Sequence, residues 1–147
     1  MESFGTITGN RVLIAAVVAW FIAQAIKFFT CLIKDKEIRI DRIMGSGGMP
    51  SAHTASVMAA TFSVGAISGY SSPEFGGLMI VAFIVMYDAA GVRRAAGKQA
   101  KAINTIVEEL GSYKIIMDGQ LKELLGHTYM EVFVGAALGI VIAIILN

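Results

Sequence analysis

The chain has 147 residues and a formal net charge of only +1, and 56% of its residues are hydrophobic. Its mean hydropathy of +0.70 is too high for a soluble domain, in which roughly 45–50% of residues are apolar. The near-neutral charge argues against nucleic acid as a partner. One cysteine excludes an internal disulfide and a cysteine-based metal site. We therefore expect a single domain, 1–147, folded as an all-helical integral membrane bundle.

Four apolar segments predict the helices that cross the membrane. We expect them over residues 12–33, 51–70, 75–96 and 128–146, each close to the roughly 20 residues that a bilayer requires. Between the last two, residues 97–110 have apolar positions at helical spacing. This pattern predicts an amphipathic helix that lies at the interface or extends the third span.

Two further features of the sequence concern its surface and its packing. Residues 34–42 alternate in charge, which suggests a short surface helix. The second and fourth spans each contain two glycines four residues apart, Gly65 with Gly69 and Gly135 with Gly139. Such pairs allow close helix contact, so we expect close packing inside the bundle, with a homodimer as the alternative.

The four-span topology places one set of loops and helix ends together. The end of the first span, the start of the second, the end of the third and the start of the fourth share one membrane side. Most Lys and Arg residues lie on that side, which the positive-inside rule assigns to the cytoplasm. We expect a protein of a bacterial plasma membrane with this side facing the cytoplasm.

A glycine-rich stretch, GSGGMPSAHT from Gly45 to Thr54, leads into the second span. Glycines permit a close approach of the backbone to a ligand, and Pro50 suits a first helical turn. The free N–H groups of that turn favour an anion, with Ser51 and His53 beside it. The alternative is that Ser51 only caps the helix and His53 lies at the membrane interface.

A second histidine opens the fourth span. His127 and Glu131 are four residues apart, so their side chains meet on one helix face. A carboxylate bonded to one ring nitrogen fixes the tautomer and leaves the other nitrogen free to attack or to accept a proton. With His53, the chain has two histidines and scattered acids, which give no recognisable ligand spacing. We therefore predict neither a metal nor another cofactor.

Charged residues near the end of the third span require partners. An unpaired Asp88 inside the bilayer would cost about 2.5–3.5 kcal/mol. Arg93 and Arg94 follow five and six residues later, where neither lies directly above it on an ideal helix. Lys27 in the first span is the other candidate partner. The pair would be purely structural, or Asp88 would orient a basic residue toward an anion.

Arg94 also begins a basic stripe with Lys98 and Lys101, at positions i, i+4 and i+7. Cations that reach the headgroup region explain such a stripe without chemistry. Phosphate capture by Arg93 or Arg94 explains it equally well, because the guanidinium fork matches phosphate oxygens.

Three stretches resemble one family. PSAH at 50–53 resembles the PSGH motif of the type-2 phosphatidate phosphatase superfamily. GHTYMEVFVGAALG from Gly126 resembles its third motif, a histidine followed four residues later by an acid and then by a glycine-rich helix. YDAAGVRRAAGKQA from Tyr87 resembles a hallmark of a small, divergent branch of membrane proteins. The resemblance covers about residues 10–147.

The resemblance implies metal-independent hydrolysis of a lipid or prenyl phosphate through a phosphohistidine. His127 would be the nucleophile, with Glu131 where the family usually has Asp. His53 would protonate the leaving oxygen, and Ser51 with the adjacent N–H groups would hold phosphate oxygens. Membrane lipids would then be its partners.

The sequence also departs from the family pattern. Gln120 and Leu121 stand where the third motif has Ser-Arg, and the Arg-Pro pair of the first motif is missing. Typical members have six spans. Losing one charge-stabilising donor can cost about 10²–10³ in rate. A lipid-phosphate binder or translocator without turnover, or a structural subunit, thus remains an alternative. In an active enzyme, the missing donors would be replaced from this set: Arg93, Arg94, Lys27, Lys98.

Overall fold

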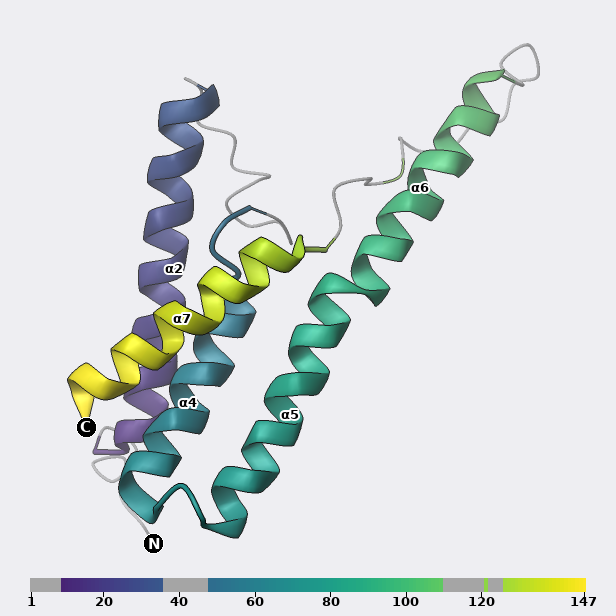
Figure 1. Ribbon diagram of the computed structural model, residues 1–147. Coiled ribbons are helices and arrows are strands. Elements are labelled where there is room, and N and C mark those ends of the chain that lie inside the picture. The colour runs from purple at the N-terminus through teal and green to yellow at the C-terminus, as the bar shows by residue number, and fades with distance from the viewer. Residues whose placement is uncertain (1–8, 36–47, 110–120, 122–125) are drawn as a thin grey trace, which may run out of the picture.

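The computed structural model describes residues 9–35, 48–109, 121 and 126–147, and these residues form a bundle of α-helices without strands. α4 lies at the centre and packs against α2, α5 and α7 (Figure 1). α6 follows α5 and leads away from the other helices. The helices are α2 (Arg11–Asp35), α4 (Ala52–Ser68), α5 (Pro73–Ala90), α6 (Val92–Glu109) and α7 (Tyr129–Leu146).

The predicted all-helical membrane bundle is confirmed. Within the described residues, three stretches are long and apolar enough to cross a bilayer: Arg11–Ile33, Pro73–Val107 and Tyr129–Leu146. Large apolar side chains are exposed along them, for example Phe21 and Ile80, each 62% exposed, as expected for a lipid-facing surface. α4 has 17 residues, about 26 Å of helix, and is the most enclosed of the four predicted spans.

The core between α2, α4 and α7 is built mainly from alanine. Small side chains let helix backbones approach closely, which is how helices associate in lipid. Hydrogen bonds between helices add to this packing, from Ser56 Oγ to the Ala16 carbonyl at 3.0 Å and from Asn147 Nδ2 to Ser63 Oγ at 2.8 Å. The cluster consists of Ala15, Ala19, Ala23, Ala52, Ala55, Ala59 and Ile142.

Of the two glycine pairs, the one in α7 brings two helix backbones together, whereas Gly65 makes room for the Tyr70 and Phe75 side chains. A Cβ on Gly139 would overlap the Ala55 carbonyl of α4, and one on Gly135 would lie 2.5 Å from the Ser51 carbonyl. The expected close packing within the bundle is therefore confirmed for α7. In the other pair, Gly69 has φ +94° and ends α4, a backbone conformation that favours glycine.

The third predicted span, 75–96, is not one uninterrupted helix. α5 ends at Ala90, and Gly91 interrupts the helix with φ −101° and ψ −81° before α6 begins. A Cβ at this position would lie 2.9 Å from the Tyr87 carbonyl oxygen, so this backbone conformation favours glycine. The amphipathic helix predicted from residue 97 therefore starts at Val92 and extends α5. Of the predicted surface helix over 34–42, α2 includes the first two residues and the rest lie outside the described residues.

Candidate functional site

The start of α7 is fixed by a reciprocal capping arrangement. The Thr128 hydroxyl accepts a hydrogen bond from the Glu131 N–H at 3.3 Å, and Glu131 Oε2 accepts one from the Thr128 N–H at 3.0 Å. This is a capping box, which satisfies two N–H groups that a helix start leaves unpaired. It also holds the Glu131 carboxylate beside the residue that precedes the cap, His127.

His127 is anchored at both its backbone and its ring. Its N–H donates to the Ala89 carbonyl near the end of α5 at 2.8 Å, and the residue is 2% exposed. Its Nδ1 lies 3.0 Å from Glu131 Oε2, which confirms the contact predicted from their spacing. An ionised carboxylate only accepts hydrogen bonds, so Nδ1 carries the hydrogen and Nε2 presents a lone pair. Nε2 is buried and has no hydrogen-bond partner among the described residues.

α4 begins at the same place and brings the second histidine. Ser51 is its N-cap: the hydroxyl accepts from the Thr54 N–H at 3.4 Å and from the Thr54 hydroxyl at 3.0 Å. The Ser51 N–H donates to the Glu131 carbonyl at 3.0 Å, which ties the starts of α4 and α7 together. His53, in the first turn, lies with its ring centre 6.5 Å from that of His127. Both rings can therefore touch one small bound group.

Two glycines permit this convergence. Gly135 lies where a Cβ would meet the Ser51 backbone, so α7 rests directly on the start of α4. Gly126, with φ +88°, packs against the backbone of Arg93 and Arg94 just after the α5 break. Any larger residue would push His127 away from the helix ends that surround it.

Lys27 of α2 contributes a buried positive charge on the same side. It is 6% exposed, and its side chain lies against Gly48, where a Cβ would come within 3.2 Å of Lys27 Cγ. It forms no ion pair with a carboxylate in the part of the chain that the structure describes, although the negative charge of Glu131 is close enough to act on the Lys27 ammonium. A buried ammonium beside two imidazoles favours an anionic ligand.

Arg93 pairs with Asp88, with 2.8 Å between Nε and Oδ2. On an uninterrupted helix, side chains five residues apart point in different directions and do not meet. The helix is broken at Gly91, between these two residues, so the rule does not apply to this pair. The two side chains are 47% and 40% exposed, so the pair adds little stability and mainly fixes the direction of the guanidinium. Its charge is close enough to act on both imidazoles.

Arg94 and Lys98 are exposed on α6, and neither contacts the two histidines among the described side chains. Their predicted role in phosphate binding, like that of Ser51, stays a prediction. The structure thus gathers His53, His127, Glu131, Lys27 and the Asp88–Arg93 pair, while Arg94 and Lys98 are exposed.

Burial lowers the pKa of His127 below its ordinary value of 6.5, and the positive charges of Lys27 and Arg93 act in the same direction. The hydrogen bond and negative charge of Glu131 oppose this effect, since they favour the imidazolium. The net result is a neutral imidazole at neutral pH, whose Nε2 lone pair is available for attack or for ligation. No group of three or more His, Cys, Asp or Glu residues is placed to hold a metal ion within the described ranges.

Sequence reasoning missed two supports of this site. Thr128 lies three residues before Glu131, and this capping-box spacing is visible in the sequence. The sequence contains a weaker indication of the backbone role of Gly126, namely a glycine directly before His127. Glycine is the residue that most readily takes positive φ, which Gly126 has.

Comparisons with known proteins place the chain in a family. A family model described as "Divergent PAP2 family" matches residues 8–142 of the chain. The chain is also 35% identical over 148 residues to "Uncharacterized membrane protein YuiD" of Bacillus subtilis (strain 168), covering 93% of this chain and 94% of that protein. No solved structure matches. The matched region includes both histidines, the Asp88–Arg93 pair, helices α2, α4, α5 and α6, and most of α7. The chain therefore belongs to the divergent PAP2 family.

Proposed function

We propose that the chain is an integral membrane phosphatase that hydrolyses a lipid or prenyl phosphate through a phosphohistidine at His127. The observation that carries the proposal is the unpaired, buried Nε2 of His127, whose tautomer is set by Glu131 and whose ring lies 6.5 Å from His53. A nucleophile bonded to an orienting carboxylate is the general arrangement of an activated histidine.

In the proposed first step, Nε2 attacks phosphorus and the bond from phosphorus to the lipid oxygen breaks. His53 gives its proton to that oxygen, because a lipid alkoxide is too basic to leave unprotonated. In the second step, water attacks the phosphohistidine, the phosphorus–nitrogen bond breaks, and His53 takes the proton of the water. Lys27 and Arg93 would stabilise the charge on the phosphoryl oxygens in both steps.

The test compares purified wild-type protein with His127→Asn and His53→Ala in lipid nanodiscs. We chose asparagine because its amide can keep a hydrogen bond to Glu131 while removing the nucleophile. Phosphate release from phosphatidate or a prenyl phosphate should be lost in His127→Asn, and so should an acid-labile, base-stable label from radioactive substrate. Equal release from wild type and this variant would overturn the assignment.

His53→Ala tests the second role separately. With p-nitrophenyl phosphate, the leaving group departs without a proton, so this variant should lose much less activity than it loses on an alkyl phosphate. Equal losses on both substrates would contradict a role as general acid.

A second candidate function, lipid-phosphate binding or translocation without turnover, is favoured by one observation. Arg93 is engaged by Asp88, and Ser51 is engaged in the helix cap, so fewer donors face the histidines than a phosphatase of this type uses. That candidate predicts binding of lipid phosphate that Arg93→Ala weakens, with no phosphate release from wild type.

A further inference from the structure

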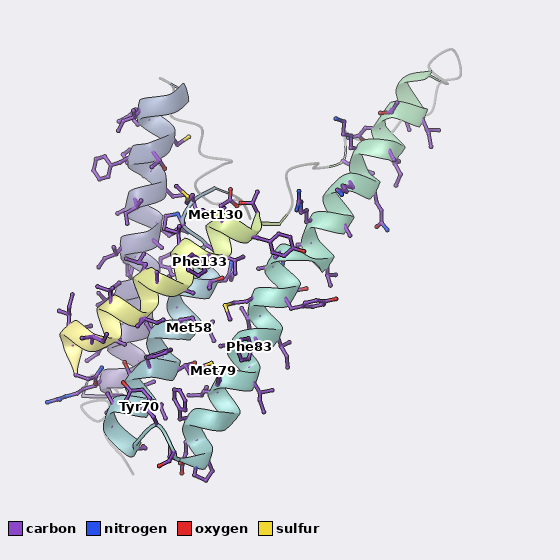
Figure 2. All side chains as sticks on the ribbon, viewed as in Figure 1. Met58, Tyr70, Met79, Phe83, Met130 and Phe133 are labelled. Atoms are coloured by element: carbon purple, nitrogen blue, oxygen red, sulfur yellow. The ribbon has the colours of Figure 1, made fainter. Side chains whose placement is uncertain are left out.

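An apolar groove of about 630 Å³ runs between α5 and α7 beside the candidate site. This volume lies within the roughly 300–1,000 Å³ range of pockets that bind small molecules. Its walls come from the last two turns of α5 and the first turn of α7, and Phe83, on the α5 side, is labelled in Figure 2. Residues that line it include Phe83, Ile84, Tyr87, Gly91, Tyr129 and Val132.

The groove is open to its surroundings along these two helices. Phe83 is 61% exposed, Tyr87 78% and Tyr129 72%, so the walls are not closed by the rest of the bundle. Both helices belong to stretches that are long and apolar enough to cross a membrane. A hydrocarbon chain could therefore enter sideways from the bilayer without crossing water.

One end of the groove lies near the site, because the lining residue Ala90 follows Ala89, whose carbonyl accepts from the His127 N–H. Val132 directly follows Glu131, Tyr129 is two residues after His127, and Gly91 is two residues before Arg93. The backbone bond from the His127 N–H to Ala89 fixes α5 and α7 to each other at this end. The groove and the two histidines are thus close enough to be tested as parts of one binding site.

We propose that the α5–α7 groove binds the hydrocarbon chain of the phosphorylated lipid whose headgroup His127 receives. The inference rests on the proposed function for the position of the headgroup, and it adds where the chain of the substrate lies. A lipid chain fits better than a second copy of the protein, because the groove has single-ligand size and lies beside the proposed phosphate site. The groove would make the protein selective for long-chain over short-chain phosphates.

The test uses two tryptophan substitutions on α5. Ile84 lines the groove and Ile80, one turn earlier, does not, while both are 62% exposed. Ile84→Trp should fill the groove, and Ile80→Trp is the matched control for a bulkier lipid-facing residue. In nanodiscs, a phosphatidate with a photoreactive group in its acyl chain should crosslink to groove residues of wild type and Ile80→Trp, and much less to Ile84→Trp.

Hydrolysis gives a second readout. Ile84→Trp should lower kcat/KM for a long-chain phosphate relative to a short-chain one by about tenfold or more, since displacing two buried methylenes already has that effect. Ile80→Trp should leave the ratio unchanged. If Ile84→Trp left both the crosslinking and the ratio of kcat/KM for long-chain over short-chain phosphates unchanged, the proposed role of the groove would be overturned.

The two proposals fail in different ways. Suppose that lipid phosphate crosslinks in the groove, that diacylglycerol without a phosphate does not compete with it, and that the wild type hydrolyses nothing. This result would support the groove as the site of the chain and would contradict the proposed enzymatic function. Hydrolysis that depends on His127, with crosslinks only outside the groove or to a second protein copy, would remove the chain site alone.

Discussion

Gly135→Ala tests whether the packing of α7 on α4 builds the site. The added methyl group would lie 2.5 Å from the Ser51 carbonyl oxygen, whereas ordinary contact begins at 3.4 Å, so the helices would have to separate by about 0.9 Å (3.4 − 2.5). Overpacking of this kind costs about 1–3 kcal/mol. The separation occurs where Ser51 is bonded to the Glu131 carbonyl, so it should also move the two histidines apart.

The expected result is therefore a loss of both stability and function. Misplacing reacting groups by about 1 Å can cost roughly 10²-fold in rate, and we expect kcat/KM for phosphate release to fall by about that factor. The assay is phosphate release in nanodiscs, together with thermal unfolding in the same preparation.

Gly77→Ala is the matched control. It lies in α5 with open space around its Cα, so the added methyl should stabilise the helix by about 0.5–1 kcal/mol and leave kcat/KM unchanged. A Gly135→Ala protein with wild-type stability and activity would refute the close approach of the two helices.

Three further predictions concern the charges of the site. Glu131→Gln removes an ionised acceptor that fixes the His127 tautomer; activity should fall by about 10²–10⁴, measured as kcat for phosphate release, and an unchanged kcat would refute the orienting role. Arg93→Ala should weaken lipid-phosphate binding more than Arg94→Ala does, because Asp88 holds Arg93 in place and the charge of Arg93 acts on both imidazoles; equal effects in a nanodisc binding assay would contradict this. Since folding lowers the pKa of His127, the unfolded chain binds a proton at this histidine more readily than the folded protein does, and the free energy of unfolding should fall as the pH drops below about 6.5. The acid limb of the activity profile should also lie below that pH. His127→Asn should flatten this part of a profile of thermal stability against pH.

The fold was predictable where hydropathy decides it. Segments of the right length and apolarity predict α2, α5 and α7, and the glycine pair Gly135 and Gly139 correctly predicts close packing of α7. The end of α5 was not predictable from apolarity alone, because the residues after Gly91 continue a helical pattern. The break comes from backbone preference at one glycine, a term that hydropathy does not contain.

The site was predictable where residues are close in sequence. The contact between His127 and Glu131 follows from their spacing of four, and the convergence of both histidines follows from topology. The Asp88–Arg93 pair was obscured because spacing rules assume an uninterrupted helix. Contacts between distant segments, such as Ser51 with Glu131, depend on packing that no local pattern encodes.

The balance of charges around the histidines bears on how a phosphate would be held. Among the described residues, the charges that act on the two rings are two cations, Lys27 and Arg93, and two carboxylates, Asp88 and Glu131. These sum to zero, so an incoming phosphate would add uncompensated negative charge in a partly buried place. A proton on His53 offsets part of that charge, and this is the proton that the leaving oxygen needs. We infer that phosphate binding and proton uptake at His53 are coupled: a bound phosphate would favour the protonated imidazole, which is the acid that the proposed first step requires.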